Sequence, residues 1–392
     1  MNRRSSRNEI IAVCGALLGL ITMAGGVLAA DRAQTLIAQS QFTGGVAVHV
    51  HGADAALLRG LQQQCPNLLG HLLVANENDA RQARESLVAA GLHGTITVAT
   101  WQSNALPFID NFVNLLIIEE GSEVPRDEIL RVLAPEGTAF LGSETLVKPR
   151  PVTMDDWPHQ LYDASGNAVS KDKALKPPLQ HLQWVGGPRW SRHHDKMSSV
   201  SACVSGDGKV FYIFDEGSTF TPYLPCHWKL IARDAFNGVV LWKRPLDQWV
   251  GNLYGLKSGP ATLPRRLVVA GNRVCVTLGI HAPVSVLAAD TGEVLQTLSG
   301  TECTEEIIHE DGLLYLVADA NAEKEEFQNG PRMNYPSGRW IVRSKQVLCC
   351  DLDAGKVLWS KTFDWVAPST LSASRGKVYL FDGKQVVSLS RE

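Results

Sequence analysis

One short pattern recurs in the second half of this 392-residue chain and constrains its fold more than any other feature. An apolar run leads to an aspartate, a tight turn closes on a glycine, and a second apolar run follows. The three glycines are Gly238, Gly292 and Gly355. An aspartate side chain accepts hydrogen bonds from turn amides and glycine supplies a positive φ angle, so each copy predicts two antiparallel strands joined by a tight turn.

Four further glycine turns accompany these copies, each followed by an apolar run. They are centred on Gly208, Gly271, Gly312 and Gly376. Two of the repeated segments end in a tryptophan, Trp242 or Trp359, which we expect to pack between neighbouring sheets. Several degenerate copies in one order predict an array of small antiparallel sheets.

Over residues 188–392 these segments together resemble the PQQ-like (quinoprotein-type) β-propeller repeat, whose pattern is "Asp-Gly-x-Val-Tyr" followed by "Asp-Ala-x-Thr-Gly" and Trp. The resemblance implies all-β propeller repeats, and these residues leave room for about four blades, fewer than that family usually has. The segment Ala320–Arg339, rich in charged residues, Asn, Pro and Gly, is predicted to be an inserted loop. Propellers close with about four to eight blades. The ring can therefore be either a short closed one or an incomplete one.

Residues 31–148 have a different pattern, in which apolar runs alternate with helix-like stretches. Such alternation predicts an α/β domain with a parallel sheet. The strands are expected at 45–50, 69–75, 95–99, 114–118 and 138–141, and the helices at 54–64, 79–90 and 126–133.

Two segments of this domain, Ala105–Asn111 and Glu128–Gly137, resemble class I S-adenosylmethionine (SAM)-dependent methyltransferases. The resemblance implies a Rossmann-like domain and, if SAM binds, the cofactor-binding residues Gly52, Glu77 and Asp110. That family's chemistry depends on a glycine-rich loop after the first strand, since only glycine lets backbone amides approach the cofactor closely. Here His51, Ala53 and Ala55 occupy the three expected glycine positions, which favours a degenerate, structural domain.

Two histidines alternate along the end of the first strand of this domain, His49 and His51. We therefore expect them not to face one site together, and each to be a solvated or core residue.

The amino terminus carries three arginines, then an apolar run over Ile10–Leu28, then Ala29 and Ala30. This pattern predicts a signal peptide at residues 1–30 and export to the periplasm or cell envelope. An uncleaved anchor is the alternative, since about twenty apolar residues span a bilayer. No transmembrane domain is expected after cleavage. Seven cysteines would then remain, an odd number that leaves at least one thiol unpaired.

Residues 149–187 contain scattered prolines and no sustained period, and are predicted to be an extended linker that wraps the second domain. His159 and Asp163, with His193, His194 and Asp195 further on, carry metal-ligand chemistry but match no metal motif. We therefore assign no metal site. The net charge is −3 and the sequence contains no stripe of basic residues, so nucleic acid is not an expected partner.

Three functions follow from these patterns, and the sequence does not decide whether the chain is an enzyme. The favoured one is a non-catalytic binding or scaffold module that contacts envelope proteins. Its contact surface would include Trp190, Arg192, Tyr223 and Trp228, unless these residues pack between blades. The alternatives are a quinoprotein-type dehydrogenase with PQQ and calcium, and a SAM-dependent methyltransferase. No catalytic residue is assigned, because no catalytic constellation or phosphate-binding loop is found.

The vicinal pair Cys349–Cys350 suits quinoprotein alcohol dehydrogenases, which are similar in carrying such a pair over the quinone. Its position inside a predicted strand argues against that role. Neighbouring side chains of a strand point to opposite faces, and a vicinal disulfide would break the strand.

Overall fold

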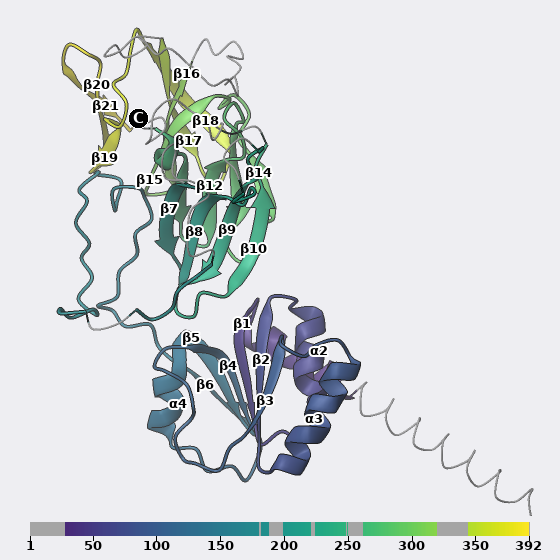
Figure 1. Ribbon diagram of the computed structural model, residues 1–392. Helices are drawn as coiled ribbons and strands as arrows, with labels where there is room; N and C mark the ends of the chain where they lie inside the picture. Colours follow the sequence, from purple (N-terminus) through teal and green to yellow (C-terminus); the bar gives the residue numbers. More distant parts are fainter. Residues whose placement is uncertain are drawn as a thin grey trace, which may run out of the picture. The chain divides into compact units, whose positions relative to one another are not determined.

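The computed structural model describes residues 28–179, 182–187, 199–220, 224–247, 249, 262–319 and 344–391. It divides into two compact units, Met1–Arg150 and Pro151–Glu392 (Figure 1). The signal sequence up to residue 27, the loop Ala320–Arg339, and Trp190, Arg192 and Tyr223 lie outside the described residues, so those expectations stay predictions. No helix in the described part of the chain is long and apolar enough to cross a bilayer.

The first unit is a Rossmann-like α/β domain built on one six-stranded sheet, in the order β3-β2-β1-β4-β5-β6. Strands β1 to β5 are parallel, as the alternating pattern predicted, and β6 pairs antiparallel with β5. The strands are β1 (Gly45–Val50), β2 (Leu68–Val74), β3 (Ile96–Thr100), β4 (Val113–Ile118), β5 (Leu133–Leu141) and β6 (Glu144–Val147). The helices are α2 (Ala56–Gln64), α3 (Glu77–Ala89) and α4 (Arg126–Val132).

The central strands of this sheet are apolar because helices and loops cover both faces. Every residue of β1 is buried. Residues 28–40 form a further helix, whose Ala33 and Leu36 join the core beside α2. Asn76 caps α3 by accepting from the Asp79 amide, and Gly91, at φ +68°, follows the end of that helix. The predicted helix and strand ranges of this domain are confirmed to within a few residues, except that β5 begins earlier than expected.

The second unit consists of antiparallel sheets, each with its strands in chain order. We number the sheets 1 to 4. Sheet 1 holds β7 (Val200–Gly206), β8 (Lys209–Asp215), β9 (Trp228–Asp234) and β10 (Val240–Pro245), and sheet 2 holds β11 (Leu267–Ala270), β12 (Arg273–Thr277), β13 (Val284–Ala288) and β14 (Val294–Thr297). Sheet 3 holds β15 (Thr304–Glu310), β16 (Leu313–Asp319), β17 (Lys345–Asp351) and β18 (Lys356–Phe363), and sheet 4 holds β19 (Ser372–Ser374), β20 (Lys377–Phe381) and β21 (Val386–Ser390). A short 3-10 helix, η1 (Leu263–Arg266), precedes β11.

The repeated turns have the predicted chemistry. Gly238, Gly292 and Gly355 all adopt positive φ angles, of +74°, +69° and +68°. The Asp234 carboxylate accepts from the amides of residues 236 and 237, and Asp351 makes the equivalent pair of bonds. The prediction of two strands around each turn is therefore confirmed, and no closed ring of sheets is found among the described residues.

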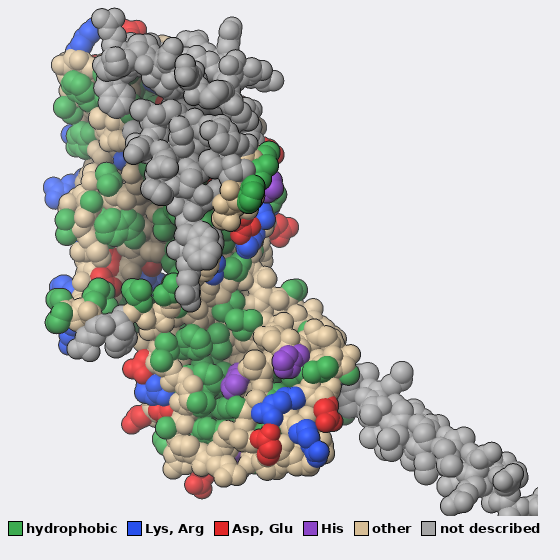
Figure 2. Space-filling model, viewed as in Figure 1, with side chains coloured by type: hydrophobic (Ala, Val, Ile, Leu, Met, Phe, Trp, Pro, Cys, Tyr) green, Lys and Arg blue, Asp and Glu red, His purple; other side chains and the backbone are tan. Residues whose placement is uncertain are grey.

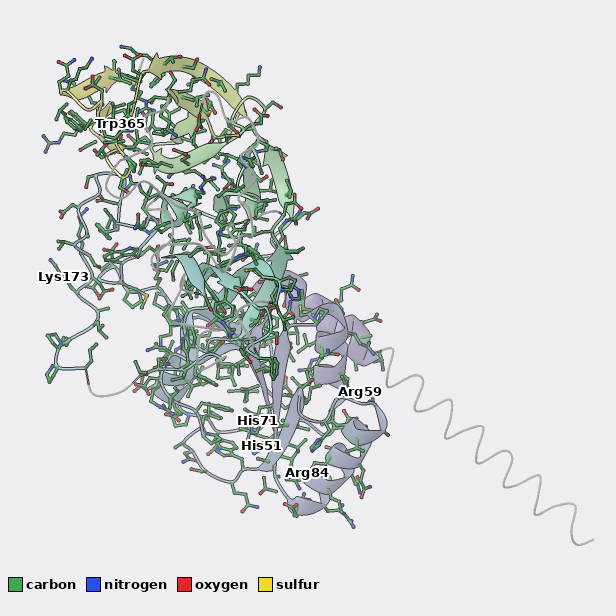
Figure 3. The ribbon with its side chains drawn as sticks, turned by 45° about the horizontal axis from the view of Figure 1, so that its top comes forward. His51, Arg59, His71, Arg84, Lys173 and Trp365 are labelled. Atoms are coloured by element: carbon green, nitrogen blue, oxygen red, sulfur yellow. The ribbon has the colours of Figure 1, made fainter. Side chains whose placement is uncertain are left out.

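A tryptophan links successive sheets in both copies that carry one, as expected. Trp242 on β10 lies over the turn of sheet 2, where its indole Nε1 donates to the Ala289 carbonyl at 2.8 Å. A Cβ at Gly292 would collide with this indole. Trp359 instead donates to the Arg391 carbonyl at 3.1 Å. Trp365, which lies in the connection between β18 and β19 and is labelled in Figure 3, contacts Gly383 in the turn between β20 and β21.

Candidate functional site

The carboxyl edge of the parallel sheet is where an α/β domain offers a ligand site. Strands β2 and β3 lie on one side of β1, and β4 and β5 lie on the other. The loops after β1 and β4 therefore leave the sheet in opposite directions, and ligands of open α/β sheets bind in the crevice between such loops. The residues at this switch point decide what the first unit can bind.

A buried histidine and a glutamate meet at this edge. His49 on β1 is 3% exposed, and its Nε2 lies 2.6 Å from Oε1 of Glu119, which directly follows β4. Arg32 donates to the same Oε1 at 2.7 Å. The hydrogen bond from His49, together with the Arg32 guanidinium, lowers the pKa of Glu119 to about 2, although partial burial opposes the shift. Glu119 is therefore an ionised anchor and not a proton donor near neutral pH.

Gly52 follows β1 and makes room for the His49 ring. An added Cβ would lie well inside van der Waals contact of the His49 ring atoms Cε1 and Nδ1. The His49 Nδ1 has no hydrogen-bond partner among the described residues. The His49 imidazole thus fills the space beside Gly52 through which a cofactor could otherwise approach the backbone closely.

His51 turns into the same edge, labelled in Figure 3. Its φ of +55° takes the backbone out of the strand conformation, and its Nδ1 lies 2.8 Å from the hydroxyl of Ser122. The ring also packs on Trp101, with the ring centroids 5.2 Å apart. His49 and His51 contact the same segment, Glu119–Ser122, so the expectation that they do not share a site is wrong. Residues two apart on a strand share a face, and the left-handed turn keeps His51 at this edge.

The structure does not bring the three predicted SAM-binding residues together. Gly52 lies at the carboxyl edge, whereas Asp110 precedes β4 and lies at the amino edge, where Arg131 donates to it at 2.8 Å. Glu77 begins α3 next to the carboxyl end of β2, but its Oε1 accepts from Arg84 at 2.7 Å along the helix. The neighbouring Asn76 serves as the helix cap.

Sequence reasoning missed Arg32, Trp101, Glu119 and Ser122 as members of this edge. Two of them had a readable signal, since Trp101 directly follows β3 and Glu119 directly follows β4, and residues just past parallel strands gather at one edge. Arg32 lies 87 positions from Glu119 and Ser122 lies 71 from His51, so only the fold pairs them.

These residues do not fit a SAM site. The glycine position is filled by His49, the expected ribose-binding carboxylate pairs with Arg84, and the third residue lies at the far edge. The arrangement can hold Glu119 ionised. It cross-links β1, the loop after β4 and the helix at residues 28–40.

The first strands of sheets 1 to 4 are a second place where segments distant in the sequence meet. The first strands of successive sheets, β7, β11, β15 and β19, contact one another in series. A segment of the linker, Trp157–Ala164, crosses all four of these strands, and we call it the strap. Its four contacts follow the order of the strands.

The strap bonds to one residue of each first strand. Trp157 exchanges two backbone hydrogen bonds with Ser205 on β7, and the Pro158 carbonyl accepts from the Val269 amide on β11. His159 Nε2 accepts from the His309 amide on β15 at 3.0 Å. The Ala164 carbonyl accepts from the Ala373 amide on β19 at 2.8 Å.

Buried polar groups accompany the strap. His159 is 5% exposed, and burial is the main cause that lowers its pKa to about 4. Arg265 of η1 pairs with Glu306 of β15 at 2.9 Å, and both side chains are almost fully buried. Arg265 also donates to the Leu371 carbonyl, next to β19.

The vicinal cysteines lie where the sequence placed them, inside β17. Cys350 packs in the core shared by sheets 2 and 3, and Cys349 packs in the core shared by sheets 3 and 4. Burial raises the pKa of the Cys349 thiol to about 11 and that of Cys350 to about 12. Their opposite orientation is confirmed, and both are free thiols, as are the five other cysteines that the structure describes.

Metal-ligand chemistry does not gather anywhere in the described ranges. No group of three His, Cys, Asp or Glu side chains there could hold a metal ion. Of the cluster noted in the sequence, His159 bonds to the sheet and Asp163 accepts from Ser165 within its own turn. His193, His194 and Asp195 lie outside the described residues.

Comparison with known proteins gives distant likenesses only, and no family model and no curated protein matches the chain. Among solved structures, the N-terminal part is similar to three methyltransferases. One is a protein of Methanococcus maripaludis assigned to the SAM-dependent methyltransferases (TM-score 0.27, 20% identity, 29% of this chain and 54% of that chain). The others are geranyl diphosphate C-methyltransferase from Streptomyces coelicolor (0.26, 11%, 28% and 43%) and a SAM-dependent methyltransferase from Aquifex aeolicus (0.24, 19%, 28% and 61%).

The chain spans less than two thirds of each of these relatives. At these TM-scores the likeness by itself identifies no activity. The strand order and the parallel pairing of β1 to β5 are what establish the Rossmann-like fold.

Proposed function

We propose that this chain is an exported, non-catalytic binding or scaffold module of the cell envelope. In this proposal sheets 1 to 4 are blades of an incomplete β-propeller, and the Rossmann-like domain is structural. The module presents a rigid β surface to envelope protein partners and uses neither PQQ nor SAM. Fold alone does not license a reaction, so the proposal depends on the two places where a cofactor would bind.

The propeller assignment is supported by the order of contacts. In a propeller the first strand of each blade lies innermost, next to the first strands of its neighbours. The contacts of β7 with β11, β11 with β15, and β15 with β19 follow this arrangement. The tryptophan of β10 on the turn of sheet 2 adds a blade-to-blade contact at the outer strand.

The strap is the single observation that carries the proposal. It bonds to the inner strand of every sheet, and its buried His159 is held by the backbone of β15. A cofactor on the propeller axis would have to replace these bonds and leave buried amides unpaired, which costs about 1–3 kcal/mol for each group. A segment of the chain itself therefore takes the cofactor's place.

A SAM-dependent methyltransferase remains the second candidate, because the β1/β4 switch point is where ligands bind in this fold. The side chains around this switch point argue against SAM binding. His49 fills the space beside Gly52, and Glu77 faces Arg84.

Thermal unfolding of the exported chain tests both cofactors at once. Scans are run with PQQ plus calcium, with SAM, and with buffer alone. A ligand at 100 times its dissociation constant stabilises the native state by about 2.7 kcal/mol. We expect no shift of the melting temperature with either ligand. A saturable rise with PQQ and calcium would establish the quinoprotein alternative, and a rise with SAM would establish the methyltransferase.

Cell fractionation tests the compartment. A C-terminally tagged chain expressed with residues 1–30 should appear in the periplasmic or envelope fraction, with its new amino terminus at residue 30 or 31 by mass spectrometry. A chain found in the cytoplasm with its amino terminus intact would contradict export. We expect no nucleic-acid partner, and basic and acidic side chains are interspersed on the face shown in Figure 2.

A further inference from the structure

The strap reaches β15 through a side chain that can take up a proton. Its bonds to Ser205, Val269 and Ala373 are made by backbone groups of the strap, which do not titrate. On β15 the acceptor is instead the imidazole of His159, whose Nε2 accepts from the His309 amide at 3.0 Å. Histidine is the side chain that changes its charge most readily between neutral and acid pH. The contact with β15 therefore responds to pH, whereas the backbone contacts do not.

The geometry fixes the protonation state in which His159 makes this bond. Because Nε2 accepts a hydrogen bond, it carries no proton, and the proton of the neutral ring is on Nδ1. The side chain is buried, and its Nδ1 has no hydrogen-bond partner among the described residues. A proton on Nε2 would point at the N–H group of His309 and would place a charge in a buried site. His159 therefore stays on β15 only while its ring is neutral.

The charged groups around His159 do not compensate a second positive charge. Asp163 of the strap favours a positive ring, whereas His309 of β15 and Arg265 of η1 oppose it. The carboxylate of Glu306 on β15 is already paired with Arg265 at 2.9 Å. Strands β7, β11 and β19 carry no charged residue. Burial is the largest cause that lowers the pKa of His159, and the neighbouring cations act in the same direction.

The middle of the strap is one compact turn that moves as a unit with His159. The His159 amide donates to the Tyr162 carbonyl at 3.3 Å, and Tyr162 is also buried. Ala164, at the end of the turn, packs in the core shared by sheets 3 and 4. His159 lies between the backbone bond to Val269 and the backbone bond to Ala373. Loss of its place on β15 therefore loosens the bonds on both sides.

We propose that protonation of His159 releases the strap from β11, β15 and β19 while sheets 1 to 4 stay folded. The strap is then an acid-opened cover, and acid makes the first strands of the sheets accessible to a partner. The two backbone bonds between Trp157 and Ser205 keep the strap tethered to β7. A ring that is neutral in the closed strap and takes up a proton in the open one drives the equilibrium toward opening as the pH falls.

Binding of a partner to the opened strands rests on the proposed function, in which the second unit is a binding module. Release of the strap does not rest on it, because the contacts that open all lie within the second unit. The test of release uses neither a cofactor nor a partner. It can therefore fail while the melting temperature stays unchanged with PQQ and SAM, and it can succeed if either ligand binds.

Hydrogen exchange of the exported chain at pH 7 and pH 4.5 tests the release. The amides of Val269, His309 and Ala373 are followed through their protection factors, which correct for the direct effect of pH on exchange. His159 has a pKa of about 4 in the closed strap and about 6.5 in an open one. The closed strap is therefore favoured above about pH 6.5, and the three protection factors should fall more than about tenfold at pH 4.5. Amides in the middle of β16 should keep their protection.

Two glutamine variants identify the ring responsible. His159→Gln retains an acceptor for the His309 amide and does not titrate, so the three amides should keep their protection at pH 4.5. His309→Gln is the matched control, because it removes the neighbouring titratable ring and leaves the backbone amide that donates to His159. Its three amides should lose protection as in the wild type. Wild-type protection of β16 at pH 7 verifies that each variant is folded.

Unchanged protection of the three amides in the wild type at pH 4.5 would overturn the proposal. So would a loss in His159→Gln as large as that in the wild type, or retained protection in His309→Gln. An equal loss of protection at the β16 amides would also overturn it, since sheet 3 would then be opening together with the strap.

Discussion

At the scale of single residues, Gly52 lacks a Cβ, and the space this leaves in its loop accommodates a neighbouring side chain. The sequence placed Gly52 in a cofactor loop, and the structure fills the space above it with His49. The imidazole donates to Glu119 and becomes part of the packing at the strand ends. A glycine in this loop is therefore explained by a side chain of the same chain.

Gly52→Ala should destabilise the first unit, because the new methyl group collides with the His49 ring. Overpacking of this kind costs about 1–3 kcal/mol. Urea unfolding measures the change, and His49→Ala provides the matched background. The same Gly52→Ala change should cost clearly less when His49 is already alanine. Equal costs in the two backgrounds would contradict the contact.

His159 gives the second unit a pH dependence of known sign. Its pKa is lowered to about 4, mainly by burial, and that of His309 is lowered in the same way. An unfolded histidine titrates near about 6.5. Between these values the unfolded chain binds the additional proton, so stability is greatest above about pH 6.5 and falls as the pH falls toward 4.

The loss at His159 should reach roughly 3 kcal/mol at the acid end of this window. Urea unfolding at several pH values between 7 and 4.5 measures it in the wild type and in His159→Gln. Glutamine retains an acceptor for the His309 amide and does not titrate. The wild type should lose more stability than the variant across the window, and parallel curves would refute the assignment.

At the scale of elements, the tryptophan of a fourth strand acts on the next sheet and not on its own. Trp242 is 8% exposed, and its indole bonds to the turn of sheet 2. Trp359 occupies the corresponding place on β18, is only partly buried, and bonds to the Arg391 carbonyl instead. The tryptophan at the end of the repeat is therefore expected to contribute more to stability in the first copy than in the last.

Trp242→Ala should cost about 3–5 kcal/mol, the range for large aromatic residues removed from a core. Trp359→Ala is the matched comparison and should cost less, because part of that side chain is already in contact with water. Chemical unfolding of both variants decides the order. The interpretation fails if Trp359→Ala proves the more costly change.

The strap is an element without regular structure whose hydrogen bonds nevertheless protect four strands. It covers the amides of Val269, His309 and Ala373, one on each of three first strands. Replacement of residues 157–164 by a Gly/Ser linker should speed hydrogen exchange at these three amides by more than about tenfold, since it removes the His159 acceptor and the buried side chains that hold the two backbone carbonyls in place. Amides in the middle of β16 should keep their protection. Unchanged exchange at all three amides would contradict their hydrogen bonds to the strap.

At the scale of the whole molecule, the chain forms two units whose stabilities should be separable. The first is held by the sheet of β1 to β6 and the second by sheets 1 to 4. Calorimetry should therefore show that Gly52→Ala lowers one transition and Trp242→Ala lowers another. If both variants shift one and the same transition, the two units unfold together.

The sequence by itself determined the local structure, because helix periods, apolar runs and turn glycines act over a few residues. The helices α2 to α4, the parallel strands β1 to β5 and the Asp–Gly turns could all be predicted in this way. The antiparallel strand β6 was missed, since its four residues are mostly exposed and carry little apolar signal.

Only the tertiary structure decided which distant residues meet. His49 and Glu119 are 70 positions apart, and His159 and His309 are 150 apart, so no local pattern pairs them. The strap could not be traced from the sequence either, because an extended segment has no period and its bonds are made by backbone groups that every residue carries. Strands and turns therefore follow from local sequence, whereas long-range contacts pair His49 with Glu119 and place the strap against the first strands of the four sheets.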